Sequence, residues 1–200
     1  MKRLGILLSG RGSNFEAIAN SIEAGKLPGA EIAIVISNRT SARGLEISRS
    51  RGIPCVAIPS AGMDRETYDG LLIEKLQEFD VDLICLAGFM RLLSTRFVEA
   101  FPQRILNIHP SLLPAFPGLD AQHQAIDYGV KIAGCTVHLV DEFLDSGPII
   151  VQRAVEVRDD DTADTLSARI LVEEHQAYTE GIRIIVEGNY RVAGRKVIRG

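Results

Sequence analysis

Short apolar runs alternate with amphipathic stretches along the first half of the chain. The apolar runs are bounded by Gly, Ser, Asn or Pro, as strands buried on both faces are, and lie at residues 4–8, 31–36, 81–87 and 104–108. Between them, apolar residues recur every three or four positions, which predicts helices at residues 14–23, 42–51, 65–79 and 94–101, the last with Ser94 as N-cap. This alternation predicts an α/β fold with a mainly parallel, twisted sheet flanked by helices, Rossmann-like in its N-terminal half.

The pattern changes after Pro110. A Pro- and Gly-rich loop is predicted first, then a helix, two β-branched strands with an acidic connection, a long helix and a hairpin, at residues 111–120, 122–128, 131–140, 148–157, 161–186 and around 193–194. Asp161 and Thr162 are expected to open the long helix, and Gly188 is expected to end it. We expect the two strands to be antiparallel additions to the sheet. The whole chain is expected to be one domain, with halves at about residues 1–108 and 109–200.

Composition and charge narrow the class of protein. The chain has 200 residues, 46% of them apolar and 24% charged, so it can bury enough surface to fold. Its net charge of -4 comes from 22 basic and 26 acidic residues that are spread along the chain. No basic stripe for a nucleic-acid backbone is visible, so nucleic acid is not the expected partner.

The cysteines and the apolar runs indicate the compartment. Cys55, Cys85 and Cys135 are far apart and odd in number, which predicts buried reduced thiols rather than disulfides or a Cys-x-x-Cys metal site. The first eight residues resemble a signal peptide, but their apolar stretch ends at Ser9-Gly10-Arg11 and is better explained by a buried strand. No run reaches the roughly 20 apolar residues that cross a bilayer. We therefore expect a cytoplasmic protein with no membrane partner.

A glycine-rich turn, Ser9-Gly10-Arg11-Gly12-Ser13-Asn14, joins the first predicted strand to the first predicted helix. Backbone N–H groups at such a helix start can receive a phosphate. The turn is a poor dinucleotide fingerprint, because Phe15 replaces the third glycine and Ser37-Asn38-Arg39 lacks the ribose-binding acid. No P-loop is present either. The segment can be interpreted equally well as a monophosphate site or as a tight turn with no ligand.

Asn107 and His109 mark the end of a buried strand. Pro110 forces the chain out of regular structure directly after the histidine. The two side chains are two residues apart and share a strand face, at the carboxyl edge where open α/β sheets bind ligands. An amide donor and an imidazole can stabilise the oxygen of a tetrahedral intermediate while the imidazole transfers protons. Without further information, a lone histidine before proline is more often a structural loop residue.

Asp145 is the candidate third member of this group. It lies in the acidic connection beside Gly147, where its carboxylate can favour a charged His109 or hold a water that relays a proton. The other histidines are weaker candidates: His138 lies within a strand, and His123 and His175 lie on helices. No pair has zinc-ligand spacing, so we expect no metal.

Four segments together resemble the phosphoribosylglycinamide formyltransferase family, in family order and over nearly the whole chain. They read S-G-R-G-S-N at 9–14, A-G-F-M-R-L-L-S at 87–94, N-I-H-P-S-L-L-P at 107–114 and D-S-G-P-I-I at 145–150. The resemblance implies a formyltransferase fold, with a nucleotide-binding half joined to a folate-binding half. It also implies transfer of the formyl group of 10-formyltetrahydrofolate to the amine of glycinamide ribonucleotide in purine biosynthesis, without a metal.

The resemblance assigns roles to particular residues. The implied catalytic residues are Asn107, His109 and Asp145. The implied glycinamide ribonucleotide site is Gly12, Ser13, Asn14, Phe15 and Glu174. The implied folate site is Arg65, Met90, Arg91, Leu92, Leu93, Asn107, Val140, Asp141, Glu142 and Asp145. A core strand would explain Leu92 and Leu93 equally well, and Arg65 is also explained as an exposed residue at a helix start.

One departure and three alternatives stay open. Many relatives have a histidine at the position of Asp120 or Gln122, and His123 cannot be assumed to replace it. A formyltetrahydrofolate hydrolase is the nearest alternative, but it carries an N-terminal regulatory domain, whereas this chain begins with its first strand. A methionyl-tRNA formyltransferase is disfavoured because no basic C-terminal extension is seen. A non-catalytic nucleotide-binding module is the alternative of another class. The expected partners are small-molecule substrates, and the protein is expected to be a monomer or a homodimer.

Overall fold

The computed structural model describes residues 1–200, which form two compact units, 1–107 and 108–200. Each unit has its own strands and helices and is described by itself. Apart from one short strand at Cys55–Ala57, the predicted order of strands and helices is confirmed in both, with bounds that shift by a few residues at most.

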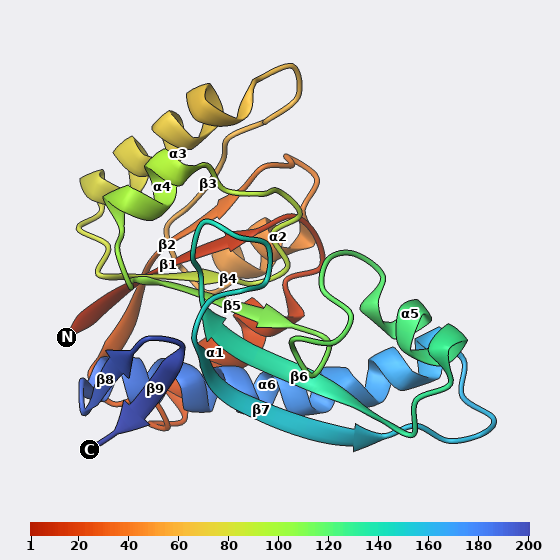
Figure 1. The fold of residues 1–200 in the computed structure, drawn as a ribbon. Helices are drawn as coiled ribbons and strands as arrows, with labels where there is room; N and C mark the ends of the chain where they lie inside the picture. Colours follow the sequence, from red (N-terminus) through yellow and green to blue (C-terminus); the bar gives the residue numbers. More distant parts are fainter. The chain divides into compact units, whose positions relative to one another are not determined.

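The first unit is a parallel sheet with helices between its strands (Figure 1). Its strands are β1 Lys2–Leu8, β2 Ala30–Ser37, β3 Cys55–Ala57, β4 Leu83–Leu86 and β5 Ile105–His109, the last of which crosses the boundary between the units. Its helices are α1 Ser13–Glu23, α2 Arg43–Ser50, α3 Arg65–Glu78 and α4 Thr95–Ala100. The strand order is β3-β2-β1-β4-β5, and every pair is parallel. The predicted α/β class is therefore confirmed.

The central strands of this sheet consist of continuous apolar runs and are buried. Leu4, Ile6, Ile36 and Ile84 are completely buried. Continuous rather than alternating hydrophobicity is what a parallel strand needs, because neither of its faces meets water. The short strand β3 was missing from the prediction, since its three residues are only half-buried and carry no period.

Helix ends in this unit follow from polar side chains. The side chain of Ser94 accepts a hydrogen bond from the Phe97 N–H, which confirms it as the N-cap of α4. Asp64 caps α3 in the same way through Thr67. These caps use donors that the first turn of a helix leaves without partners.

The second unit is built around an antiparallel pair covered by a long helix (Figure 1). Its strands are β6 Ile132–Leu139, β7 Ile149–Glu156, β8 Tyr190–Ala193 and β9 Lys196–Arg199, and its helices are α5 Ala121–Tyr128 and α6 Ala163–Glu187. Strand β9 pairs with β7 in parallel and with β8 in a hairpin. The predicted antiparallel strands, long helix and hairpin are thus confirmed.

Helix α6 is fixed by its packing and its ends. Leu166 and Ile170 are completely buried, and a Cβ at Gly181 would lie 2.6 Å from Cγ1 of Val137 on β6. Thr162 opens the helix with a capping box, and Gly188 closes it in the left-handed conformation. Both ends were predicted from these residue types.

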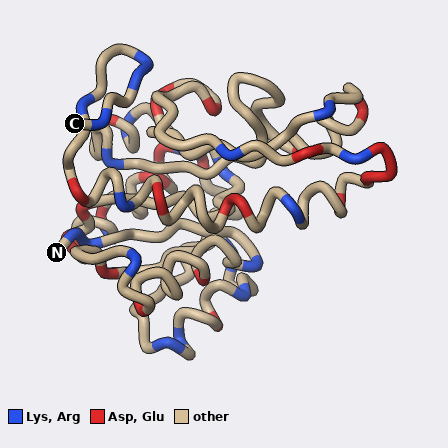
Figure 2. The backbone as a smooth tube through the Cα atoms, turned by 90° about the horizontal axis from the view of Figure 1, so that it is seen from below, with Lys and Arg blue, Asp and Glu red and all other residues tan.

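The charges are mixed in sign along the chain. Figure 2 shows Lys and Arg interspersed with Asp and Glu, without a long run of either. No helix is both long and apolar enough to span a bilayer. All three cysteines are free thiols, as predicted, but only Cys85 and Cys135 are buried, whereas Cys55 is partly exposed.

The glycine turn between β1 and α1 is sterically tight at only one of its glycines. Gly12 has φ 78°, and a Cβ there would lie 2.8 Å from the Cα atom of Gly44 on α2. A Cβ at Gly10 would meet no atom within 4 Å. The close approach of two helix starts therefore requires glycine at position 12.

Replacing Gly12 with Ala should destabilise the protein by at least about 1–2 kcal/mol, because left-handed backbone disfavours a Cβ and the Gly44 backbone blocks it. The matched control Gly10→Ala should change the free energy of unfolding by no more than about 0.5 kcal/mol. Urea unfolding followed by circular dichroism measures both. Equal stabilities for the two variants would show that the contact with Gly44 does not limit this position.

Candidate active site

His109 and Asp145 are brought together in the second unit from distant parts of the chain. His109 is the last residue of β5 and is buried. Its Nδ1 lies 3.4 Å from Oδ2 of Asp145, whose side chain is 10% exposed. Its Nε2 lies 2.9 Å from the backbone carbonyl oxygen of Phe116. The pair that the sequence suggested is therefore in contact.

These two contacts fix the orientation of the imidazole ring. A carbonyl oxygen can only accept, so Nε2 of His109 donates its proton to Phe116. Nδ1 faces the carboxylate oxygen Oδ2 of Asp145. Their 3.4 Å separation is longer than the roughly 2.7–2.9 Å of a charge-assisted hydrogen bond, so this contact does not saturate either group. The arrangement suits stabilisation of a negatively charged oxygen.

The conformation of the connection between β6 and β7 sets the position of Asp145. Asp145 has φ 46°, an uncommon value for a residue other than glycine. Its Oδ2 accepts a 2.8 Å hydrogen bond from the Gly118 N–H. A Cβ at Gly147 would lie 1.8 Å from the carbonyl oxygen of Leu139, so only glycine fits two residues later. The carboxylate is thus fixed by its own backbone and by the loop after Pro110.

His138 lies beside Asp145, although the sequence indicated only a weak candidate within a strand. It lies on β6, is 2% exposed, and its Nε2 lies 3.7 Å from Oδ1 of Asp145. Its Nδ1 donates to the Leu139 carbonyl oxygen at 2.9 Å. Burial lowers the pKa of His138, although the Leu139 carbonyl and Asp145 oppose the shift, so the ring is neutral near pH 7. Its position inside a buried strand was the available signal that it needed a polar partner.

The loop after Pro110 is held by side chains of β6 and β7. The hydroxyl of Thr136 donates to the Ser111 carbonyl oxygen at 2.7 Å and accepts from the Leu113 N–H at 3.0 Å. Gln152 on β7 donates to the Leu113 carbonyl oxygen at 2.9 Å. The start of this loop is therefore ordered, although its composition predicted only irregular structure.

The glycine turn of the first unit presents the start of α1. No side chain caps this 11-residue helix, and its N-cap is Gly12. Ser13 and Asn14 form its first turn together with Phe15. The ring of Phe15 is completely buried, so only its backbone can contact a ligand. A helix start without a side-chain cap suits an anion, because backbone N–H groups and the helix dipole both favour negative charge.

The segment after β4, in the first unit, exposes apolar side chains. Met90 is 60% exposed and Leu92 is 52% exposed. No strand covers residues 91–94, so the core-strand alternative for Leu92 and Leu93 is wrong. The Met90 N–H donates to the Ser9 hydroxyl at 2.9 Å, and the Arg91 guanidinium lies over the Tyr68 ring at 4.6 Å. These contacts fix the backbone and leave an apolar surface open.

The remaining candidates lie in different surroundings. Arg65 is the exposed first residue of α3, as the helix-start interpretation expected. Asn107 lies on β5, two residues before His109. Glu174 is buried on α6. Val140, Asp141 and Glu142 follow β6 in the connection that also holds Asp145, beside the exposed side chains of Phe143 and Leu144.

Comparisons with known proteins identify the family of this chain. The formyl transferase family model matches residues 2–182. This chain belongs to the formyl transferase family. A Bacillus subtilis phosphoribosylglycinamide formyltransferase is 41% identical over 192 residues, which are 96% of this chain and 98% of that protein. A glycinamide ribonucleotide transformylase 1 structure from Symbiobacterium toebii is 50% identical and superposes with a TM-score of 0.97 over all of this chain and 94% of that one.

Two other similar proteins have longer chains. The Drosophila melanogaster trifunctional purine biosynthetic protein adenosine-3 is 45% identical over 189 residues, 94% of this chain, yet the match spans only 14% of its length. A formyltetrahydrofolate deformylase structure from Pseudomonas syringae is 28% identical with a TM-score of 0.93, and the match covers 99% of this chain and 65% of that one. The fold is therefore common to proteins with different named activities, and the function has to be argued from the site.

His138 should make stability depend on pH. Its folded pKa lies below its ordinary value, so its contribution is complete above about pH 6.5 and is lost as the pH falls toward the folded pKa. This group alone can contribute a slope of up to about 1.4 kcal/mol per pH unit. We expect His138→Gln to flatten the fall in unfolding free energy between about pH 6.5 and 5, measured by urea titration. The His123→Gln control on α5 should keep the original slope, and an equally steep slope in His138→Gln would contradict the assignment.

Proposed function

We propose that this protein transfers the formyl group of 10-formyltetrahydrofolate to the amine of N1-(5-phospho-D-ribosyl)glycinamide, in de novo purine biosynthesis. The observation that carries the proposal is the buried His109–Asp145 contact at the end of β5, in a chain that matches a phosphoribosylglycinamide formyltransferase over nearly its full length. We place this reaction in the cytoplasm and expect small molecules as its only substrates. We propose that the protein acts as a monomer or a homodimer.

The proposed chemistry is direct transfer between two nitrogens. The glycinamide amine attacks the formyl carbon, and the carbonyl oxygen becomes negatively charged. The Asn107 amide and the Nδ1 proton of His109 stabilise that oxygen. The bond from the carbon to the folate nitrogen then breaks, and the proton lost by the amine passes to that nitrogen, through a water held by Asp145. No covalent intermediate with the protein is needed.

The first unit supplies the proposed phosphate site. The backbone of Gly12, Ser13, Asn14 and Phe15 would hold the substrate phosphate at the start of α1, where no side chain caps the helix. Glu174 would bind the glycinamide portion, since a carboxylate suits a polar amine and amide. Gly12 is also needed for packing against Gly44, so its structural and ligand roles coexist.

The exposed apolar segments supply the proposed folate site. Met90, Arg91, Leu92 and Leu93 would contact it in the first unit, together with Arg65 for its carboxylates. Val140, Asp141, Glu142 and Asp145 would contact it in the second unit. The supporting observation is that Met90, Leu92, Phe143 and Leu144 are each more than half exposed, although large apolar side chains are usually buried.

A hydrolase acting on the same folate is the second candidate. The deformylase structure shares the fold, but at lower identity and over a smaller share of its own length than the transferases. A non-catalytic nucleotide-binding module would leave the buried His109–Asp145 contact without a use.

One assay separates the transferase, the hydrolase and the binding module. The protein is mixed with 10-formyltetrahydrofolate, with and without glycinamide ribonucleotide. Our proposal requires folate turnover that depends on the amine and yields a formylated amine.

We expect Asn107→Ala, His109→Ala and Asp145→Asn each to lower kcat much more than they raise either Kd. Loss of one oxyanion donor costs about 2.7–4 kcal/mol, or about 10²–10³-fold in rate. Steady-state assays with both substrates and calorimetric binding measure the two effects. His123→Ala, on α5, is the matched control and should keep its rate. An unchanged kcat in any of these three variants would show that the replaced residue has no catalytic role.

A further inference from the structure

The carbonyl group that fixes His109 belongs to a residue in an uncommon conformation. Phe116 has φ 51°, in the left-handed region that aromatic residues rarely adopt. Its carbonyl oxygen accepts the Nε2 proton of His109 at 2.9 Å. Any relaxation of this backbone would turn the carbonyl group, so something must keep Phe116 in place.

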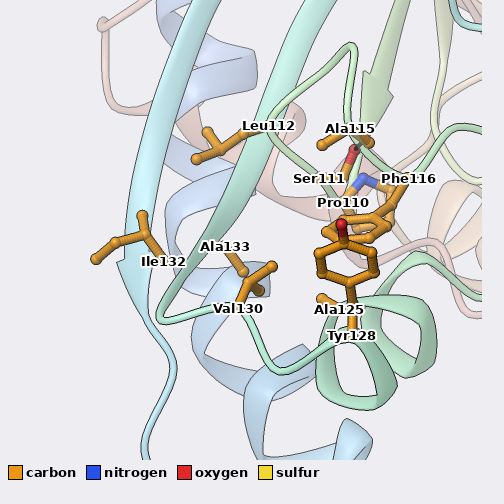
Figure 3. Close-up of a pocket in the computed structure, with 10 residues that line it drawn as sticks. All are labelled: Pro110, Ser111, Leu112, Ala115, Phe116, Ala125, Tyr128, Val130, Ile132 and Ala133. Atoms are coloured by element: carbon orange, nitrogen blue, oxygen red, sulfur yellow. Dashed lines mark hydrogen bonds between the residues drawn. The ribbon is translucent and has the colours of Figure 1, made fainter.

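The ring of Phe116 packs against Tyr128, the last residue of α5. Their ring centroids are 5.8 Å apart at an interplanar angle of 64°, an edge-to-face arrangement. Figure 3 shows the two rings side by side, Phe116 from the loop and Tyr128 from the helix. Tyr128 is 80% exposed, so burial does not explain an aromatic residue there. This contact gives the surface tyrosine a role.

A cavity beside Phe116 makes the contact with Tyr128 important for holding the loop in place. Phe116 and Tyr128 line a cavity of about 380 Å³ together with Pro110, Leu112 and Ala115 of the same loop. A loop beside open volume has fewer packing contacts to restrain it than one in a filled core. The edge-to-face contact with α5 therefore restrains the side of Phe116 that the core does not.

We propose that Phe116 and Tyr128 are positioning residues, which orient the imidazole of His109 by holding the Phe116 carbonyl group against Nε2. Their action passes from the Tyr128 ring to the Phe116 ring, then through the Phe116 backbone to His109. The catalytic consequence rests on the proposed function, whereas the orientation of His109 does not.

A kinetic test separates positioning from folding. Tyr128→Ala should lower kcat at least about 10-fold, because small displacements of a catalytic group are costly, while both KM values change less than about twofold. Tyr128→Phe keeps the ring and should restore the wild-type kcat. Asp127→Ala, the neighbouring residue on α5, should match the wild type. A wild-type kcat in Tyr128→Ala, or no restoration by Tyr128→Phe, would overturn the proposal.

A spectroscopic test does not depend on the reaction. The ¹⁵N and ¹H signals of His109 Nε2 should move in Tyr128→Ala and in the milder Phe116→Leu, and should stay in place in Tyr128→Phe and Asp127→Ala. Unmoved signals in Tyr128→Ala or Phe116→Leu, in protein that melts like the wild type, would overturn the proposal. Shifted signals in a protein that forms no formylated amine would support the positioning role and defeat the proposed function instead.

Discussion

The contact between His109 and Asp145 is the constraint on which the rest of the site depends. A buried carboxylate is costly unless it finds donors, and Asp145 finds the Gly118 N–H on one oxygen and two histidines nearby. Burial lowers the pKa of His138, and His109 is the histidine whose ring nitrogen lies nearer the carboxylate, at 3.4 Å against 3.7 Å. The unusual backbone at Asp145, and the glycine that must follow at position 147, are the local features that hold this geometry.

The fold explains why such a site forms at this place. The strands of the first unit are too apolar to carry polar chemistry in their interiors, so polar side chains collect where strands end, as Asn107 and His109 do at the end of β5. In the second unit, β6, β7 and α6 form a packed base from which Thr136 and Gln152 hold the loop that follows His109. Rigid strands thus position irregular segments, and the irregular segments carry the proposed function.

The order and ends of most strands and helices could be predicted from the sequence, whereas tertiary contacts and contacts made by backbone groups could not. Strand and helix order followed from apolar periods, and the ends of α4 and α6 followed from Ser94, Thr162 and Gly188. The half-buried β3 had no period to detect. Asp145 was chosen for its chemistry, but its contact with His109 is tertiary and has no local signal. The carbonyl of Phe116 could not be predicted, because every residue has a carbonyl group and only the fold decides where it points.

The central claim is that His109 and Asp145 act as one unit. A kinetic double-mutant cycle with His109→Ala, Asp145→Asn and the double variant measures this directly. Our account predicts non-additivity, with the double variant impaired by much less than the product of the two single effects, because part of the carboxylate's effect is exerted through the imidazole. Rate losses that multiply, so that the double variant is slower by the product of the two single effects, would contradict it.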